Sequence, residues 1–196
     1  TPLRLALTTL EHEGLIESLP GGGFTVREFT LGEIDDAIEL RGVLEGTAAR
    51  FAAERLESVE ELAELHETAV LLDEVVADAS AEAMVSYVEL NETFHAQLVA
   101  LAKSEVVTRA IGRAQAVPFA SPGALVPSLA DHPEWQASLV VAQHQHRTLL
   151  EAIARRQGAR ADQIVSEHAC LSRRNRDLVL ARRDILDVLP GAPLRC

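Results

Sequence analysis

The fold is decided by the stretch Asn91-Glu92-Thr93-Phe94-His95. It lies in a longer run whose members are three or four residues apart: Met84, Val88, Asn91, His95, Leu98 and Ala102. This spacing places the side chains on one face of an α-helix. Four of the six side chains are apolar, so we expect the face to point into a core and to carry Asn91 and His95 with it.

Two later segments repeat the pattern, each with one histidine on its apolar stripe. The stripes comprise Leu139, Ala142, His146, Leu149 and Ile153, and then Ala161, Ile164, His168, Leu171 and Leu178. Three helices would therefore each turn one histidine toward a common core. This convergence is the strongest functional signal in the sequence.

The composition indicates one good-sized helical core in an acidic chain. The 196 residues are rich in alanine, leucine, glutamate and arginine, and the net charge is −12. Residues 31–90 carry 16 acidic side chains against 3 basic ones, so the rest of the chain is close to neutral. This balance argues against broad adhesion to nucleic acid or membrane, but it leaves room for a small DNA-reading surface.

Neither the cysteines nor the apolar runs indicate a secreted or membrane protein. Cys170 and Cys196 form no metal-type pair, and we expect both to be reduced thiols. The sequence has no run of membrane-spanning length and opens with no secretory signal. We therefore expect a cytoplasmic protein without a membrane partner.

The first thirty residues predict a short helix followed by a two-strand hairpin. Thr1-Pro2 suits a helix start, and Leu3, Ala6, Leu7 and Leu10 form an apolar stripe. Two short strands, 15–19 and 24–26, flank the turn Pro20-Gly21-Gly22-Gly23. This order is that of the second half of a winged helix-turn-helix, in which Arg4, Thr8 and Thr9 would face DNA.

From Thr30 onward the pattern is helical almost to the end. Capping boxes at Thr30 with Glu33 and at Ser58 with Glu61 open the first two helices, and four more are expected near 81–102, 104–117, 135–157 and 159–183. The prolines and glycine within 119–133 predict an irregular connection. Residues 190–196 are expected to be a loose tail.

The three histidines suggest a metal site, although a single core histidine is usually only hydrogen-bonded. Buried neutral imidazoles need partners, and one divalent cation satisfies three nitrogens at once. The carbonyl of Asn91, one turn before His95, is the fourth candidate ligand. Imidazole-rich ligation suits zinc, nickel or another late first-row metal.

Arg41 is the second candidate functional residue. It lies on the inward stripe of the first long helix, and a buried guanidinium requires an anionic partner. One alternative is a salt bridge to Glu45 or Glu89, and the other is the carboxylate of a small organic acid. His144 is a further candidate for the lining of the effector pocket.

The sequence resembles two modules of a known family of regulators. The segments Thr1-Pro2-Leu3-Arg4-Leu5-Ala6-Leu7, Leu10 and Glu13-Gly14-Leu15-Ile16 resemble the recognition helix and wing of GntR-type transcriptional regulators. The later motifs resemble the FadR-type C-terminal domain: Glu39-Leu40-Arg41, Leu44-Glu45, Asn91 with Phe94-His95, His146 with Ile153, and His168. The two helices that precede the recognition helix in such modules would fall before Thr1.

This resemblance implies an all-α fold, an antiparallel bundle of six to seven helices preceded by the remnant of a winged helix-turn-helix. The implied divisions are a partial DNA-binding domain at 1–28, an effector-binding and dimerisation domain at 29–189, and the tail. The DNA contacts would come from Thr1, Arg4, Thr8, Gly21 and Gly22. The implied partners are an operator and a second copy of the chain in a homodimer.

The resemblance also bears on the metal and on Arg41. Many such domains hold a metal with an aspartate four residues before the first histidine, so the implied ligands are Asn91, His95, His146 and His168. Asn91 departs from that pattern, and the lost negative charge should weaken cation binding. Relatives use an arginine at the place of Arg41 to hold the carboxylate of an effector.

The sequence therefore predicts a ligand-responsive, DNA-binding transcriptional regulator that is not an enzyme. Its helical domain would bind a small carboxylic acid, through a metal ion. Two alternatives remain open: a metal-dependent enzyme with a three-histidine site, and a small-molecule sensor that acts independently of DNA.

Overall fold

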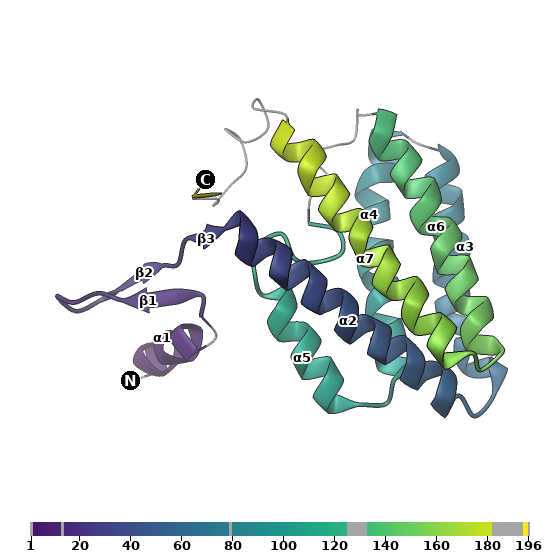
Figure 1. Ribbon diagram of the computed structural model, residues 1–196, viewed down its shortest axis with the longest axis horizontal. Helices are drawn as coiled ribbons and strands as arrows, with labels where there is room; N and C mark the ends of the chain where they lie inside the picture. Colours follow the sequence, from purple (N-terminus) through teal and green to yellow (C-terminus); the bar gives the residue numbers. More distant parts are fainter. Residues whose placement is uncertain (1, 13, 79, 125–132, 182–193, 196) are drawn as a thin grey trace.

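The computed structural model describes residues 2–12, 14–78, 80–124, 133–181 and 194–195 (Figure 1). Within this part of the chain the fold is a helical bundle with a small module at its N-terminal side. The predicted all-α bundle with a wing-like hairpin is confirmed.

The N-terminal module consists of α1 (Pro2–His12), β1 (Ile16–Ser18) and β2 (Phe24–Val26). The strands pair antiparallel, with Ile16 opposite Val26. Gly22 and Gly23 have positive φ angles in the turn between them, which explains the glycine-rich sequence there. Figure 1 shows this module projecting from the end of the bundle at which α2 begins.

The bundle contains six α-helices among the described residues. They are α2 (Leu31–Arg55), α3 (Ala63–Asp78), α4 (Ala81–Leu101), α5 (Glu105–Gln115), α6 (Pro133–Ala154) and α7 (Gly158–Ala181), with the 3₁₀ helix η1 (Val59–Leu62) before α3. Both predicted capping boxes are present, at Thr30 and at Ser58. The second box opens η1 rather than an α-helix.

The central element of the bundle is α2, which packs against α4, α5, α6 and α7. The largest of these contacts is with α7, and the two helices run side by side in Figure 1. Two glycines make this close packing possible. A Cβ on Gly42 would lie 2.6 Å from the Cβ of Ala169, and one on Gly46 would meet the side chains of Asp162 and Ser166.

Two residues of the predicted tail form a short strand. Leu194–Arg195 form β4, which pairs in parallel with β3 (Phe29–Thr30) just before α2. The unpaired backbone groups of β3 can accept a second strand, and the side-chain pattern of a two-residue strand is too short to predict such pairing. The other residues of the predicted tail lie outside the described part of the chain.

None of the described helices is both long and apolar enough to span a bilayer.

The close approach of α2 and α7 can be tested with alanine substitutions at two helical glycines. Gly42→Ala should lower the free energy of unfolding by about 1–3 kcal/mol, because the new methyl group would overlap Ala169. In Gly112→Ala on α5 the new methyl group would have no neighbouring atom within 4 Å, so this substitution should raise the free energy of unfolding by about 0.4–1 kcal/mol. Urea denaturation measures both, and equal effects of the two substitutions would contradict the packing described here.

Candidate metal centre

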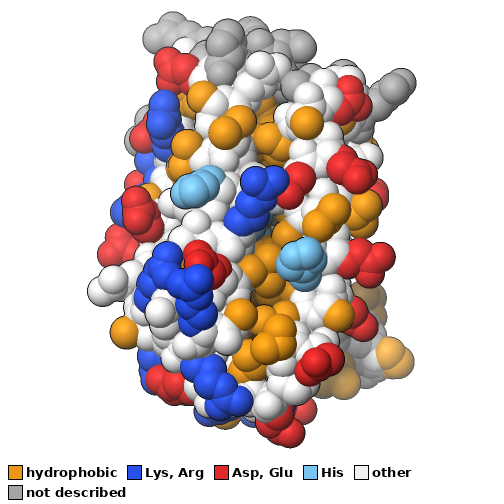
Figure 2. Space-filling model, turned by 90° about the vertical axis from the view of Figure 1, so that its right-hand side faces the viewer, with side chains coloured by type: hydrophobic (Ala, Val, Ile, Leu, Met, Phe, Trp, Pro, Cys, Tyr) orange, Lys and Arg blue, Asp and Glu red, His pale blue; other side chains and the backbone are white. Residues whose placement is uncertain are grey.

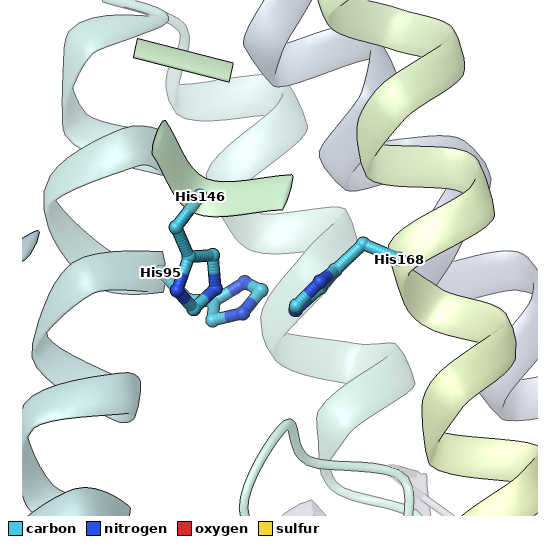
Figure 3. A group of neighbouring side chains, drawn as sticks. All are labelled: His95, His146 and His168. Atoms are coloured by element: carbon cyan, nitrogen blue, oxygen red, sulfur yellow. The ribbon is translucent and has the colours of Figure 1, made fainter. Parts of the chain in front are cut away.

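Three histidines from three helices meet inside the bundle. His95 comes from α4, His146 from α6 and His168 from α7, and Figure 3 shows their rings grouped together. One ligand nitrogen from each lies within 4.8 Å of the others. The ring centroids are 5.7 Å apart for His95 and His146, 5.3 Å for His95 and His168, and 4.7 Å for His146 and His168.

The space between the rings is small and has mostly apolar walls. The cavity has a volume of about 10 Å³, and Phe94, Leu98 and Leu149 are among its lining residues. His95 and His146 are buried, and His168 is partly buried. A cavity of this size has room for one ion or one water molecule.

The orientation of His146 is fixed through its Nδ1. This nitrogen lies 3.1 Å from Oε1 of Gln143. The amide nitrogen of Gln143 donates to the carbonyl of Ala69 and to Asp73, so its oxygen must be the atom that faces the ring. Because an amide oxygen only accepts, Nδ1 carries the proton and Nε2 keeps its lone pair. That Nε2 is buried and has no hydrogen-bond partner.

The other two histidines follow the same arrangement. The Nδ1 of His168 lies 2.9 Å from Oε1 of Gln145, and the Nδ1 of His95 lies 3.3 Å from Oε2 of Glu45. The contact to Glu45 is at ion-pair distance but is poorly aligned for a hydrogen bond, so both ring nitrogens of His95 lack one. Metal-binding histidines typically bind through one nitrogen and donate the other N–H to an oxygen.

The electrostatics favour neutral rings at His146 and His168. Burial, reinforced by the neighbouring imidazoles, lowers the pKa of His146 well below its ordinary value. Burial and the charge of His95 lower the pKa of His168 to about 3. A neutral imidazole offers the lone pair that a metal needs, so these residues fit a late first-row divalent cation.

Asn91 is buried beside this cluster but lies outside the small cavity between the rings. Its Oδ1 accepts a long, 3.5 Å hydrogen bond from the hydroxyl of Tyr87. It lines an adjoining cavity of about 20 Å³ with His168 and Ser172. The predicted fourth ligand is thus a neighbour of His168, with its carbonyl oxygen only weakly engaged.

Arg41 forms the salt bridge that the sequence left as one of two alternatives. Its Nη1 lies 3.3 Å from Oε2 of Glu45, and its Nη2 donates to Oγ of Ser172 at 2.8 Å. Both charged side chains are 1% exposed. The Nε of Arg41 is buried without a partner.

A larger cavity adjoins His95 between α4 and α5. Its volume is about 490 Å³, and His95, Val99, Ile111 and Pro122 contribute to its walls. Polar groups come from Glu92, Thr108, Gln115 and Ser121. This space is of the size that a small organic ligand requires, and it reaches the histidine cluster directly.

A still larger groove lies on another face of the molecule, away from the three clustered histidines. It has a volume of about 640 Å³, and it is formed by η1, α3 and α6 with Val70 and Leu150 among its apolar walls. Figure 2 shows the face that carries α3 and α6, with apolar side chains along a hollow and charged side chains at its borders. None of the three clustered histidines lines it, so it is not the site described here.

His144 does not join the cluster. It is exposed on α6, because two residues along a helix correspond to a rotation of about 200° away from His146. His144 is not among the lining residues of the cavities beside the clustered histidines. The helical periodicity of the sequence also places His144 outside the apolar stripe that contains His146.

The predicted DNA contacts lie on the N-terminal module. Arg4, Thr8, Gly21 and Gly22 are exposed there, and the hydroxyl of Thr8 donates to the carbonyl of Arg4. Thr1 lies outside the described residues. Leu3 and Leu5 of α1 are also 71% and 70% exposed, so the described part of the chain does not cover the apolar side chains of this helix.

Three residues that contact the rings were not predicted as site residues: Gln143, Gln145 and Glu45. Gln143 precedes His146 by three positions, a spacing at which helical side chains meet, and this signal was available. Gln145 reaches across to His168 on another helix, which no local pattern indicates. Glu45 was considered only as a partner of Arg41, and its contact with His95 depends on how α2 and α4 pack.

Comparisons with known proteins agree with this fold. Residues 36–170 match the FCD domain family. The Nta operon transcriptional regulator of Aminobacter aminovorans is 34% identical over 111 residues, which cover 57% of this chain and 50% of that protein. The chain thus spans about half the length of that relative. The solved structure of E. coli McbR/YncC aligns with a TM-score of 0.64 at 20% identity, over 92% of this chain and 79% of that one.

The depressed pKa values predict how the metal-free protein responds to acid. The unfolded chain binds protons at His168 near pH 6.5, whereas the folded chain binds them only near pH 3. Stability should therefore be complete above about pH 6.5 and fall as the pH drops toward 3. Thermal melts across this range should show a shallower fall for His168→Gln than for His66→Gln on the exposed part of α3. Parallel curves for both variants would contradict the burial of the His168 ring.

Proposed function

Because the chain belongs to the FCD domain family, the FadR-type branch of the GntR-type regulators, we propose that it is a ligand-responsive, DNA-binding transcriptional regulator. Its helical domain binds a small carboxylic acid beside a divalent metal ion. The observation that carries this proposal is the convergence of three imidazoles, two of which, His95 and His146, have a buried Nε2 without a hydrogen-bond partner.

The metal is held by His95, His146 and His168, with the carbonyl of Asn91 as the weaker fourth contact. Zinc and nickel suit this donor set. The bound ion supplies a Lewis acid that attracts a carboxylate oxygen. Oxygens of Gln143 and Gln145 are within hydrogen-bond distance of Nδ1 of His146 and His168, and Oε2 of Glu45 lies 3.3 Å from Nδ1 of His95.

The effector occupies the cavity of about 490 Å³ that adjoins His95. Its acid group points toward the metal, and its remaining polar groups meet Thr108, Gln115 or Ser121. Arg41 keeps its pairing with Glu45 through Nη1, and its unpartnered Nε is the part of the guanidinium left to meet the acid.

DNA binding belongs to the N-terminal module in the context of the whole protein. The exposed positions of Arg4 and Thr8 on α1, and the glycine turn of the hairpin, suit contacts to a duplex. A homodimer would present two such modules to a palindromic operator. Effector binding would favour one dimer arrangement and so change operator affinity. A cytoplasmic location follows from this role.

A metal-dependent enzyme is the weaker alternative. Among the described residues, the carboxylate nearest to the imidazoles is that of Glu45, which is already engaged by Arg41 and His95. A general base needs a free acceptor that faces the substrate. The named relative is also a transcriptional regulator. A sensor without DNA binding remains an alternative for the helical domain alone.

The metal site can be tested by elemental analysis of the purified protein. Protein supplied with zinc or nickel should retain the ion in stoichiometric amount, and His146→Ala should lose it, while His66→Ala on the surface should not. Asn91→Asp, which restores the usual carboxylate, should bind more tightly than the natural sequence. Wild-type protein that retains no ion would refute the metal site.

The effector class can be tested by thermal shift with a panel of small carboxylic acids. At least one acid should raise the melting temperature of the zinc-loaded protein, because a ligand that binds only the folded state stabilises it. The same acid should have no effect after chelation or in His146→Ala. Stabilisation that persists in both controls would place the acid elsewhere, and would separate effector binding from the metal.

A further inference from the structure

Glu45 is a buried carboxylate with contacts on three sides. Its Oε2 lies 3.3 Å from Nδ1 of His95 and 3.3 Å from Nη1 of Arg41. Its Oε1 accepts from Nε2 of Gln115 at 3.4 Å. The residue itself is 0% exposed, so no solvent shares this environment. Each oxygen is thus held by a donor from the protein.

An ionised carboxylate in such a position requires compensation. Arg41 supplies it, because its guanidinium lies at ion-pair distance from the carboxylate and is equally buried. The guanidinium that pairs with it is itself anchored on α7 through Ser172. The charge of Glu45 is therefore fixed in place rather than free to move toward the histidines.

Glu45 is not placed to be a metal ligand itself. Among the described residues, the group whose ligand atoms lie mutually within 4.8 Å consists of the three histidines alone. The carboxylate faces the side of His95 that carries Nδ1. Any effect of Glu45 on a bound ion must therefore pass through this imidazole.

We propose that Glu45 is the positioning residue of the metal centre: its carboxylate holds the Nδ1–H of His95 and leaves Nε2 free to bind the ion. Glu45 also supplies the negative charge that Asn91 does not provide, and this charge acts on the ion through the ring of His95. This inference rests on the metal site proposed above. Carboxylates behind metal-binding histidines fix the tautomer and raise the basicity of the ligand nitrogen.

The tautomer of His95 can be read directly in the metal-free protein. Long-range ¹H–¹⁵N correlation spectra at about pH 8, where an ordinary histidine is neutral, should show the proton of His95 on Nδ1. His146 and His168 provide internal references with the same tautomer. In Glu45→Gln, whose amide can also donate, His95 should shift toward the Nε2–H form. A wild-type His95 protonated on Nε2 would overturn the proposal.

Metal affinity provides the second readout. Titration with zinc in a competing chelator should show about ten- to hundredfold weaker binding for Glu45→Gln than for wild type. Glu39→Gln, at an exposed site on the same helix, is the matched control and should bind as wild type does.

The outcomes separate the two proposals. Equal zinc affinity of wild type and Glu45→Gln would overturn the role of Glu45 while leaving the metal site intact. Absence of zinc binding by wild type would overturn both. If Glu45→Gln does not fold, the tautomer of wild-type His95 still decides whether the carboxylate holds its Nδ1–H.

Discussion

The buried carboxylate of Glu45 is the constraint on which the arrangement of the bundle interior depends. It contacts Arg41 on its own helix, His95 on α4 and Gln115 on α5, and Arg41 continues the network to Ser172 on α7. Removing either Arg41 or Glu45 would leave the other as a buried charge without its ionic partner, which costs about 3–5 kcal/mol. Four helices are thereby held in one register around the histidines.

A network of this kind contributes more to specificity than to stability. Replacing a buried ion pair by apolar side chains of similar volume is often neutral or stabilising. The apolar core around Leu65, Leu72 and Phe94 already supplies the burial that folds the bundle. The polar interior, with unpaired imidazole nitrogens beside a ligand-sized cavity, is consistent with the binding site proposed above.

One helix connects this interior to the N-terminal module. Helix α2 begins at Leu31, directly after β3, and Glu45 lies 14 residues further along, a distance of roughly 21 Å at 1.5 Å per residue. The close contact of Gly42 and Gly46 with α7 ties this helix to the one that carries His168. A ligand that moved α4 or α7 would act on α2, and through it on the module.

The helices, their caps and the inward direction of His95, His146, His168 and Arg41 could be predicted from the amino-acid order, because helical periodicity and capping are local properties. Which atoms meet in the interior depends on how the helices pack. Two contacts join segments far apart in the sequence: Gln145 with His168, and β4 with β3. The sequence offered Arg41 two alternatives, a salt bridge or an effector carboxylate, and local pattern alone did not choose between them. Periodicity gives the direction of a side chain relative to its own helix, but its partner depends on the rotation and spacing of neighbouring helices.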